Sequence, residues 1–333
     1  MESFHPSHAI AARAQPSVRY LPVSLFGSVM SVAGLSLAWR LAHKAYGADL
    51  AVSPAIAQAI GMLALAMFVI LSLSYLSKLI KHPALVKQEF SHPVIGSFFG
   101  TVSISILLLS SVIGSYSASA QLIVWIIGTV LTLALSIVMI SRMLNGNAAP
   151  ATVMPAWLIA GVGSLDIVVS GGAYMEGWAY QVNLLAAAVG SISAIVFFIL
   201  IFSRLIHHDP LVDGMRPSKM ILMAPFSVGF IAYVNLVQRV DMFASLLFYF
   251  GLFLFVIIFY RLMVKPAAFS PSWWAIGFPM AALTNAAFIY AGAVGGTGLA
   301  LIAAILLLLL TVSIAVLAYR TLHGLFTRRL LIG

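Results

Sequence analysis

The stretch HPVIGSFFGTVSISILLLSSVIGS, residues 92–115, carries no Asp, Glu, Lys or Arg and consists mostly of apolar side chains. An α-helix needs about 20 mostly apolar residues to cross the hydrocarbon core of a bilayer. The stretch therefore predicts a membrane-spanning helix. Its proline lies near the start and is followed by glycines and by a series of Ser and Thr, a combination that recurs elsewhere in the chain.

The 333 residues contain ten such apolar runs. We place them near residues 20–41, 55–77, 93–115, 119–141, 151–170, 180–203, 219–237, 241–263, 272–292 and 297–320. Apolar residues make up 62% of the chain and charged residues 8%, whereas soluble domains carry about 25% charged residues. The sequence predicts an all-α integral membrane protein with ten spans and no separate soluble domain.

The basic residues are distributed unevenly between the two sides that ten spans define. Fourteen of the 17 Lys and Arg fall on one side, and only Arg40, Lys44 and Arg239 fall on the other. Since cytoplasmic loops are enriched in Lys and Arg, both termini are expected in the cytoplasm. We expect a tail over residues 1–19, a transmembrane domain over 20–320 and a second tail over 321–333. The net charge is +9, but the Lys and Arg residues form no patch interleaved with aromatic residues. The charge therefore does not indicate a nucleic-acid partner.

One proline accompanies each odd-numbered span: Pro22, Pro93, Pro155, Pro225 and Pro279. Proline removes a backbone hydrogen bond and kinks a helix, which is better tolerated against protein or a watery cavity than against lipid. Recurrence at the length of a helical hairpin indicates a repeated unit. We therefore expect five hairpins around a central pore, with bent odd helices inside and straight even helices outside.

Small and polar residues in the odd spans support this arrangement. The candidates for the pore lining are Ser24, Gly27, Gly100, Ser103, Gly163, Gly229 and Asn285. The alternative is that the prolines and small residues only permit close packing between helices.

Three stretches carry a family resemblance: SLFGSVMSVAGLSLAWR at residues 24–40, KQEFSHPVIGSFFG at 87–100 and FPMAALTNAA at 278–287. They resemble the tellurite-resistance/dicarboxylate transporter family, which includes bacterial TehA, the slow-type anion channels of plant guard cells, and fungal malate and sulfite transporters. The resemblance implies a homotrimer of the bacterial inner membrane, with one pore in each protomer. It also implies that Phe278, beside Pro279, plugs that pore as a gate.

Asp166 lies within the fifth predicted span. An ionisable residue inside a membrane is a candidate functional residue. It could have a structural role near the outer end of the span, take part in proton-linked transport, or pair with a base such as Arg239 or Lys44. An ionised Asp166 in the pore would repel anions.

Two functions fit these features. The first is a gated anion channel for small monovalent anions such as chloride and nitrate, because a hydroxyl lining suits weakly selective passage. The second is a proton-coupled transporter of a dicarboxylate, sulfite or tellurite, in which Asp166 would titrate. We expect no enzyme, metal or cofactor, since the chain has no cysteine and its histidines show neither metal-ligand spacing nor a catalytic grouping.

Overall fold

The computed structural model describes residues 17–50, 52–146 and 149–327. The predictions for residues 1–16 and 328–333, most of the two tails, lie outside the described residues. The described chain is all-helical. Its α-helices are α1 (Phe26–Leu50), α2 (Pro54–Lys81), α3 (Pro83–Ser91), α4 (Gly100–Ile113), α5 (Ala118–Leu144), α6 (Trp157–Ser170), α7 (Gly177–His207), α8 (Ala224–Val237), α9 (Met242–Val264), α10 (Gly277–Val294) and α11 (Thr297–Phe326).

Several short 3-10 helices lie between these elements. They are η1 (Val18–Tyr20), η2 (Val23–Leu25), η3 (Ile95–Phe99), η4 (Pro150–Thr152), η5 (Gly171–Ala173), η6 (Asp213–Met223) and η7 (Pro271–Ile276). Four of them, η2, η3, η6 and η7, lead directly into α1, α4, α8 and α10. Each of these α-helices therefore begins as a tighter 3-10 segment and widens into an α-helix.

Nine helical segments within the described ranges are long and apolar enough to cross a membrane, and a further apolar segment, Trp157–Ala173, is shorter. This shorter segment is α6 followed by η5, with 14 and 3 residues. At about 1.5 and 2.0 Å per residue it rises about 27 Å, close to the ~30 Å of a hydrocarbon core. The prediction of an all-helical chain with many membrane-spanning helices is confirmed.

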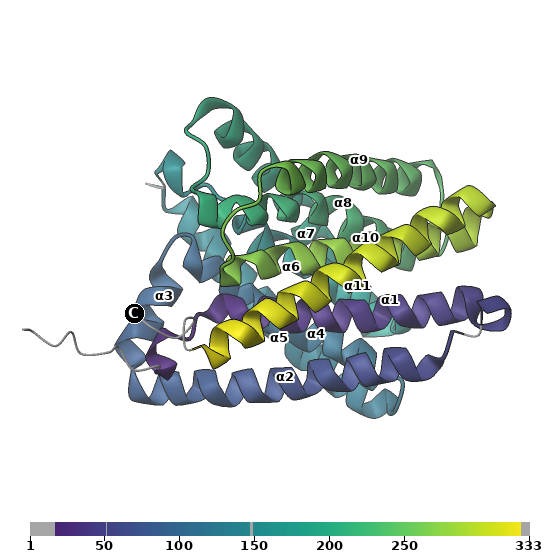
Figure 1. Ribbon diagram of the computed structural model, residues 1–333, viewed down its shortest axis with the longest axis horizontal. Helices are drawn as coiled ribbons and strands as arrows, with labels where there is room; N and C mark the ends of the chain where they lie inside the picture. The colour runs from purple at the N-terminus through teal and green to yellow at the C-terminus, as the bar shows by residue number, and fades with distance from the viewer. Residues whose placement is uncertain (1–16, 51, 147–148, 328–333) are drawn as a thin grey trace, which may run out of the picture.

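Five helices form a ring in which each packs against two others, in the order α1, α4, α6, α8, α10 and back to α1. Each of the other five long helices packs against the ring helix that precedes it: α2 on α1, α5 on α4, α7 on α6, α9 on α8 and α11 on α10. Figure 1 shows the start of α1 and the end of α11 at the same end of the bundle.

Burial separates the ring helices from their partners. In the spans built on α1, α4, α8 and α10, 61–83% of the central residues are buried, against 17–33% in α2, α5, α7, α9 and α11. The partner helices instead expose large apolar side chains, among them Ile137, Ile192, Val256 and Leu308. A surface of this composition matches lipid rather than water.

The five prolines lie at helix starts or in the turns before them. Pro22 caps η2, Pro93 and Pro155 lie in the turns before η3 and α6, Pro225 is the second residue of α8, and Pro279 is the third residue of α10. The first turn of a helix has N–H groups without an intrahelical partner, so proline sacrifices no hydrogen bond there. In α1, α4, α8 and α10 the expected kink is therefore replaced by a change of helix type at the start, whereas α6 begins directly after the turn that contains Pro155.

A short helix, α3, lies between the predicted spans 55–77 and 93–115, at the end of the bundle that holds the start of α1 (Figure 1). The Lys78 ammonium of α2 is buried there, 1% exposed. It donates to Glu89 Oε1 of α3 at 2.6 Å and to the Leu21 carbonyl at 2.7 Å. The Tyr75 hydroxyl donates to Glu89 Oε2 at 2.6 Å.

At the other end of the chain, α11 continues to Phe326, beyond the expected end of the last span at residue 320.

Candidate functional site

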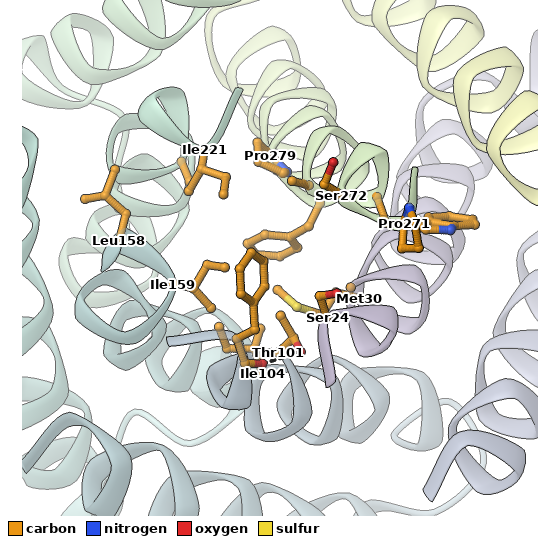
Figure 2. Close-up of a pocket in the computed structure, with 16 residues that line it drawn as sticks. Ser24, Met30, Thr101, Ile104, Leu158, Ile159, Ile221, Pro271, Ser272 and Pro279 are labelled. Atoms are coloured by element: carbon orange, nitrogen blue, oxygen red, sulfur yellow. Dashed lines mark hydrogen bonds between the residues drawn. The ribbon is translucent and has the colours of Figure 1, made fainter. Parts of the chain in front are cut away.

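All five ring helices, with their 3-10 segments, contribute to one pocket, which we call the inner pocket (Figure 2). Its volume is about 40 Å³. A water needs about 10–15 Å³ of such space, so the pocket has room for about three waters. Its lining includes Ser24, Gly27, Met30, Phe98, Thr101, Ile104, Leu158, Ile159, Ile221, Ala224, Trp274, Phe278 and Pro279. Two of the predicted lining residues, Ser24 and Gly27, are among them.

Two phenylalanines from different ring segments line the inner pocket. Phe278 belongs to the first turn of α10, directly before Pro279, and its side chain is half-buried. Phe98 belongs to η3 and is buried. Phe98 was not predicted as a site residue, although it lies in the stretch HPVIGSFFG. The available signal in the sequence was its position shortly after Pro93.

The other predicted lining residues lie away from the inner pocket. Gly100 and Gly163 are packed tightly at the contacts of α4 with α6. Ser103 lines a side groove between α2, α4 and α5, and Gly229 lines another between α7, α8 and α9. Asn285 is buried on α10. For Gly100 and Gly163 the structure matches the packing alternative, because a small residue lets two ring helices approach closely.

A second pocket, the outer pocket, lies at the other end of the ring helices. It has a volume of about 350 Å³ and is lined by Arg40, Ser111, Gly114, Ser115, Gln121, Val169, Ser170, Gly172, Ala173 and Asn235. The Arg40 guanidinium donates to the Ser111 carbonyl at 2.9 Å and to Ser115 Oγ at 3.1 Å. These bonds hold a positive charge at the outer pocket, a position that the sequence does not predict for Arg40.

The two pockets lie on the same face of α4. Residues three, four or seven apart share a face of an α-helix. Thr101 and Ile104 line the inner pocket, and Ser111 and Ser115 line the outer pocket. Leu108 lies between them on that face and is 2% exposed. The face that joins the two pockets is therefore closed midway by an apolar side chain.

The corresponding face of α6 carries a polar residue between the pockets. Asp166 follows Ile159 of the inner pocket by seven residues and precedes Ser170 of the outer pocket by four. It is 1% exposed, and neither carboxylate oxygen has a hydrogen-bond partner among the residues that the structure describes. On α10, Asn285 follows Phe278 by seven residues, and its amide oxygen is also buried without a partner among the described residues. One unsatisfied polar group, Asp166, thus lies along the line between the pockets, and a second lies on the α10 face that begins at the inner pocket.

The structure overturns one alternative for Asp166, its pairing with Arg239 or Lys44. Arg239 Nε instead lies 3.7 Å from an oxygen of Asp241, its neighbour in the loop before α9. The Tyr233 hydroxyl donates to Asp241 at 2.7 Å and the Ala244 N–H at 3.1 Å, and these two bonds lower the pKa of Asp241. Arg239 therefore has a carboxylate partner of its own outside the spans.

The chemistry of the two pockets is that of hydroxyls, amides, aromatic rings and one guanidinium. Donors of this kind can replace part of the hydration shell of an anion. Neither pocket pairs a nucleophile with a histidine base, as covalent catalysis requires. No group of three His, Asp or Glu side chains that could hold a metal occurs in the described parts of the chain.

Comparisons with known proteins point to one family. The SLAC1 family, described as voltage-dependent anion channel, matches residues 20–322. The S-type anion channel SLAH2 of Arabidopsis thaliana is 24% identical over 323 residues, which cover 95% of this chain and 61% of that protein. The guard cell S-type anion channel SLAC1 of the same plant is 24% identical over 289 residues, 84% of this chain and 51% of that protein. The tellurite resistance protein TehA homolog of Haemophilus influenzae is 25% identical over 274 residues, 80% of each chain.

Proposed function

Since the chain belongs to the SLAC1 family of voltage-dependent anion channels, we propose that it is a gated channel for small monovalent anions such as chloride and nitrate. The observation that carries this function is the pair of pockets at the two ends of a five-helix ring. A path that has two mouths and is closed between them is what a gated channel needs. Proteins of this family are channels or transporters rather than enzymes.

The proposed channel has ten spans in five hairpins, each pairing one ring helix with one outer helix. The fifth span is α6 with η5, whose ~27 Å rise suffices for a crossing of about 30 Å. The proposed transmembrane domain occupies residues 20–320, between tails at 1–19 and 321–333, and α11 extends past the domain into the second tail as far as Phe326. The excess of Lys and Arg at one side supports a cytoplasmic position for both tails, on the side that the inner pocket faces.

Phe278 is the proposed gate. Its ring lies in a pocket of about 40 Å³, which is too small for an anion with its water shell. The ring is half-buried on the first turn of α10, so it can rotate away without leaving a large void in the core. Phe98 lines the same pocket and contributes to its closure. An apolar constriction of this kind also closes by excluding water.

Weak binding along the path suits rapid passage. Arg40 attracts anions to the outer mouth, where two hydrogen bonds hold its guanidinium in place. On the faces between the pockets the described residues are apolar or uncharged apart from Asp166. An anion therefore meets no strong trap, and one that sheds water readily should pass best.

The function is tested by recording currents from the purified chain in planar bilayers with different anions on the two sides. We expect reversal potentials that follow the chloride and nitrate gradients and little current carried by malate. Uptake that needs a proton gradient, with no anion current in the wild type or in Phe278→Ala, would contradict a channel.

The second candidate is a proton-coupled transporter of a dicarboxylate, sulfite or tellurite. Asp166 favours it, because a buried carboxylate without partners on the path is a group that could take up and release a proton. Loss of pH-driven uptake in Asp166→Asn, with the fold intact, would favour this function over the channel.

We further propose, from the family resemblance, that three copies assemble in a bacterial inner membrane with a pore in each. The exposed apolar faces of the outer helices offer the surface for both lipid and neighbouring copies. Cross-linking in membranes followed by gel electrophoresis tests this assembly, and a predominantly monomeric pattern would contradict it.

A further inference from the structure

The side groove that Ser103 lines lies at the end of the bundle where α3 is found (Figure 1). It has a volume of about 370 Å³, and its walls come from α2, α4 and α5 together with aromatic residues of the neighbouring segments. The leucines that α2 and α5 contribute to it include side chains that are 44–49% exposed. Since α2 and α5 are two of the outer helices, the groove opens to the bilayer, where acyl chains rather than water surround it.

A positive charge lies at one end of this groove. Leu131 and Leu135 line the groove from α5, and Arg142 follows Leu135 by seven residues, so all three share one face of the helix. The seven residues correspond to about 10 Å along α5. The Arg142 Cζ lies 4.4 Å from the centre of the Phe90 ring, and the Arg142 Nη1 donates to the Phe90 carbonyl at 2.6 Å. Because Phe90 itself lines the groove, these contacts hold the guanidinium at its end.

A second cation lies beside the first, on α3. Lys87 precedes Phe90 by three residues, so it shares a face of α3 with this groove residue, and its side chain is exposed. The ion pairs within the described chain include neither Arg142 nor Lys87. The nearby Glu89 carboxylate is already bound by two residues of α2. Two positive charges without a carboxylate partner in the described ranges therefore accompany the end of an apolar groove.

We propose that the groove binds one anionic phospholipid from the leaflet at the basic end of the bundle. The headgroup phosphate accepts hydrogen bonds from Arg142 and Lys87, and one acyl chain lies between α2 and α5. A guanidinium binds phosphate oxygens through paired donors, and the bonds of Arg142 to its described neighbours use Nη1 alone. In the proposed orientation this leaflet is the cytoplasmic one, whose anionic lipids attract basic residues.

The charges favour a lipid over other occupants. A free phosphate ion would meet the two cations but leave the groove unfilled, so its walls would lose packing contacts. A second copy in a parallel orientation would bring its own basic end to this level, because 14 of the 17 Lys and Arg fall on this side. An anionic phospholipid supplies both a negative group and an apolar chain.

The lipid would lie against the segment that carries Phe98. Within η3, Phe98 lines the inner pocket and Phe99 lines the groove. The centre of the Phe99 ring lies 5.0 Å from that of Phe90 and 6.1 Å from that of Tyr75, which line the groove as well. An acyl chain in the groove therefore packs on the same 3-10 segment that borders the proposed gate.

The test is native mass spectrometry of the full chain in detergent, titrated with palmitoyl-oleoyl phosphatidylglycerol or with the zwitterionic phosphatidylcholine of the same chains. We expect phosphatidylglycerol to bind about tenfold more tightly. Its binding should weaken about tenfold in Arg142→Gln and about fivefold in Lys87→Gln. Lys81→Gln is the charge control, because Lys81 follows Leu79 of the groove by two residues and so points away from it. If Arg142→Gln does not fold, the exposed Lys87 carries the test.

A groove variant separates the lipid from other occupants. Ser72→Trp fills the groove without changing a charge and should weaken phosphatidylglycerol binding at least fivefold, whereas Ser74→Trp, on α2 but outside the lining, should not. Equal binding of the two lipids, or wild-type binding in folded Lys87→Gln, would overturn the site.

Two further outcomes would assign the features to another occupant and overturn the lipid site. Displacement of the lipid by millimolar inorganic phosphate, with no effect of Ser72→Trp, would make the ligand a free ion. A changed oligomeric mass in Ser72→Trp, with unchanged lipid binding, would make the groove a contact between copies. None of these results depends on ion flux, so a failure here leaves the channel proposal separately testable.

Discussion

Replacing Phe278 with alanine should turn a nearly closed pore into an open one. The substitution removes a phenyl ring from a pocket of only about 40 Å³ that all five ring helices share. The enlarged space would admit enough water to accompany an anion through the constriction. Because Phe278 is half-buried, the cost in stability should be below the ~3–5 kcal/mol typical of Phe→Ala in a packed core.

The size of the effect follows from desolvation. An ion stripped of water in an apolar constriction bears a penalty of several kcal/mol. If wetting recovers about 3 kcal/mol of this barrier, the flux rises roughly a hundredfold, since each 1.4 kcal/mol corresponds to a factor of ten. Phe98→Ala should act in the same direction, because Phe98 lines the same pocket.

The assay is single-channel or macroscopic chloride current from reconstituted protein of matched density. Phe288→Ala is the matched control. Phe288 is buried on the same helix and packs against Tyr46, but it lines neither the inner nor the outer pocket. It should lower stability without raising the current. If Phe278→Ala and Phe98→Ala both assemble normally and conduct no better than the wild type, the gate lies elsewhere.

Three further substitutions test other features of the fold and the path. Asp166→Asn should keep the anion current and remove any pH dependence of it between pH 5 and 8, measured in the same bilayers; a lost current would give Asp166 an indispensable role. Lys78→Met leaves the Glu89 carboxylate without its buried partner, and we expect a loss of about 3 kcal/mol in stability, seen as a lower unfolding temperature in detergent. Gly34→Val forces α1 from α10, because a Cβ at residue 34 would lie 2.6 Å from the Ala281 Cβ; it should cost about 1–3 kcal/mol, and an unchanged melting temperature would contradict this close approach.

Much of the fold is readable from the sequence because lipid imposes simple rules. Apolar runs of sufficient length predict spans, and the content of small and polar residues separates helices that face protein from those that face lipid. The helices that carry the five prolines are the ones that form the ring. The prediction that these prolines kink their helices was wrong. Pro225 and Pro279 lie in the first turns of their helices, where a proline needs no kink.

The site was harder to predict because a pocket depends on how side chains meet across helices. The sequence predicted Phe278 as a gate and Ser24 and Gly27 as lining residues, and all three line the inner pocket. Phe98 was not predicted, because an aromatic residue in an apolar run usually packs against neighbouring helices. Arg40 was read as a loop charge, since its place at the outer mouth depends on bonds to α4, more than 70 residues away in the chain.

The ring helices are proposed to enclose the path of the anion. The chain has no cysteine, so single cysteines can be introduced without removing native ones. On α8, Val228 follows Ala224 of the inner pocket by four residues and precedes Asn235 of the outer pocket by seven, so it shares the face between the pockets, as Leu108 does on α4. In the Phe278→Ala background we expect Leu108→Cys and Val228→Cys to react with a water-soluble anionic methanethiosulfonate and to block the current. Ile137→Cys and Leu308→Cys, on the exposed faces of α5 and α11, should stay unreactive. Reaction and block at Ile137 and Leu308, with Leu108 and Val228 inert, would contradict the path.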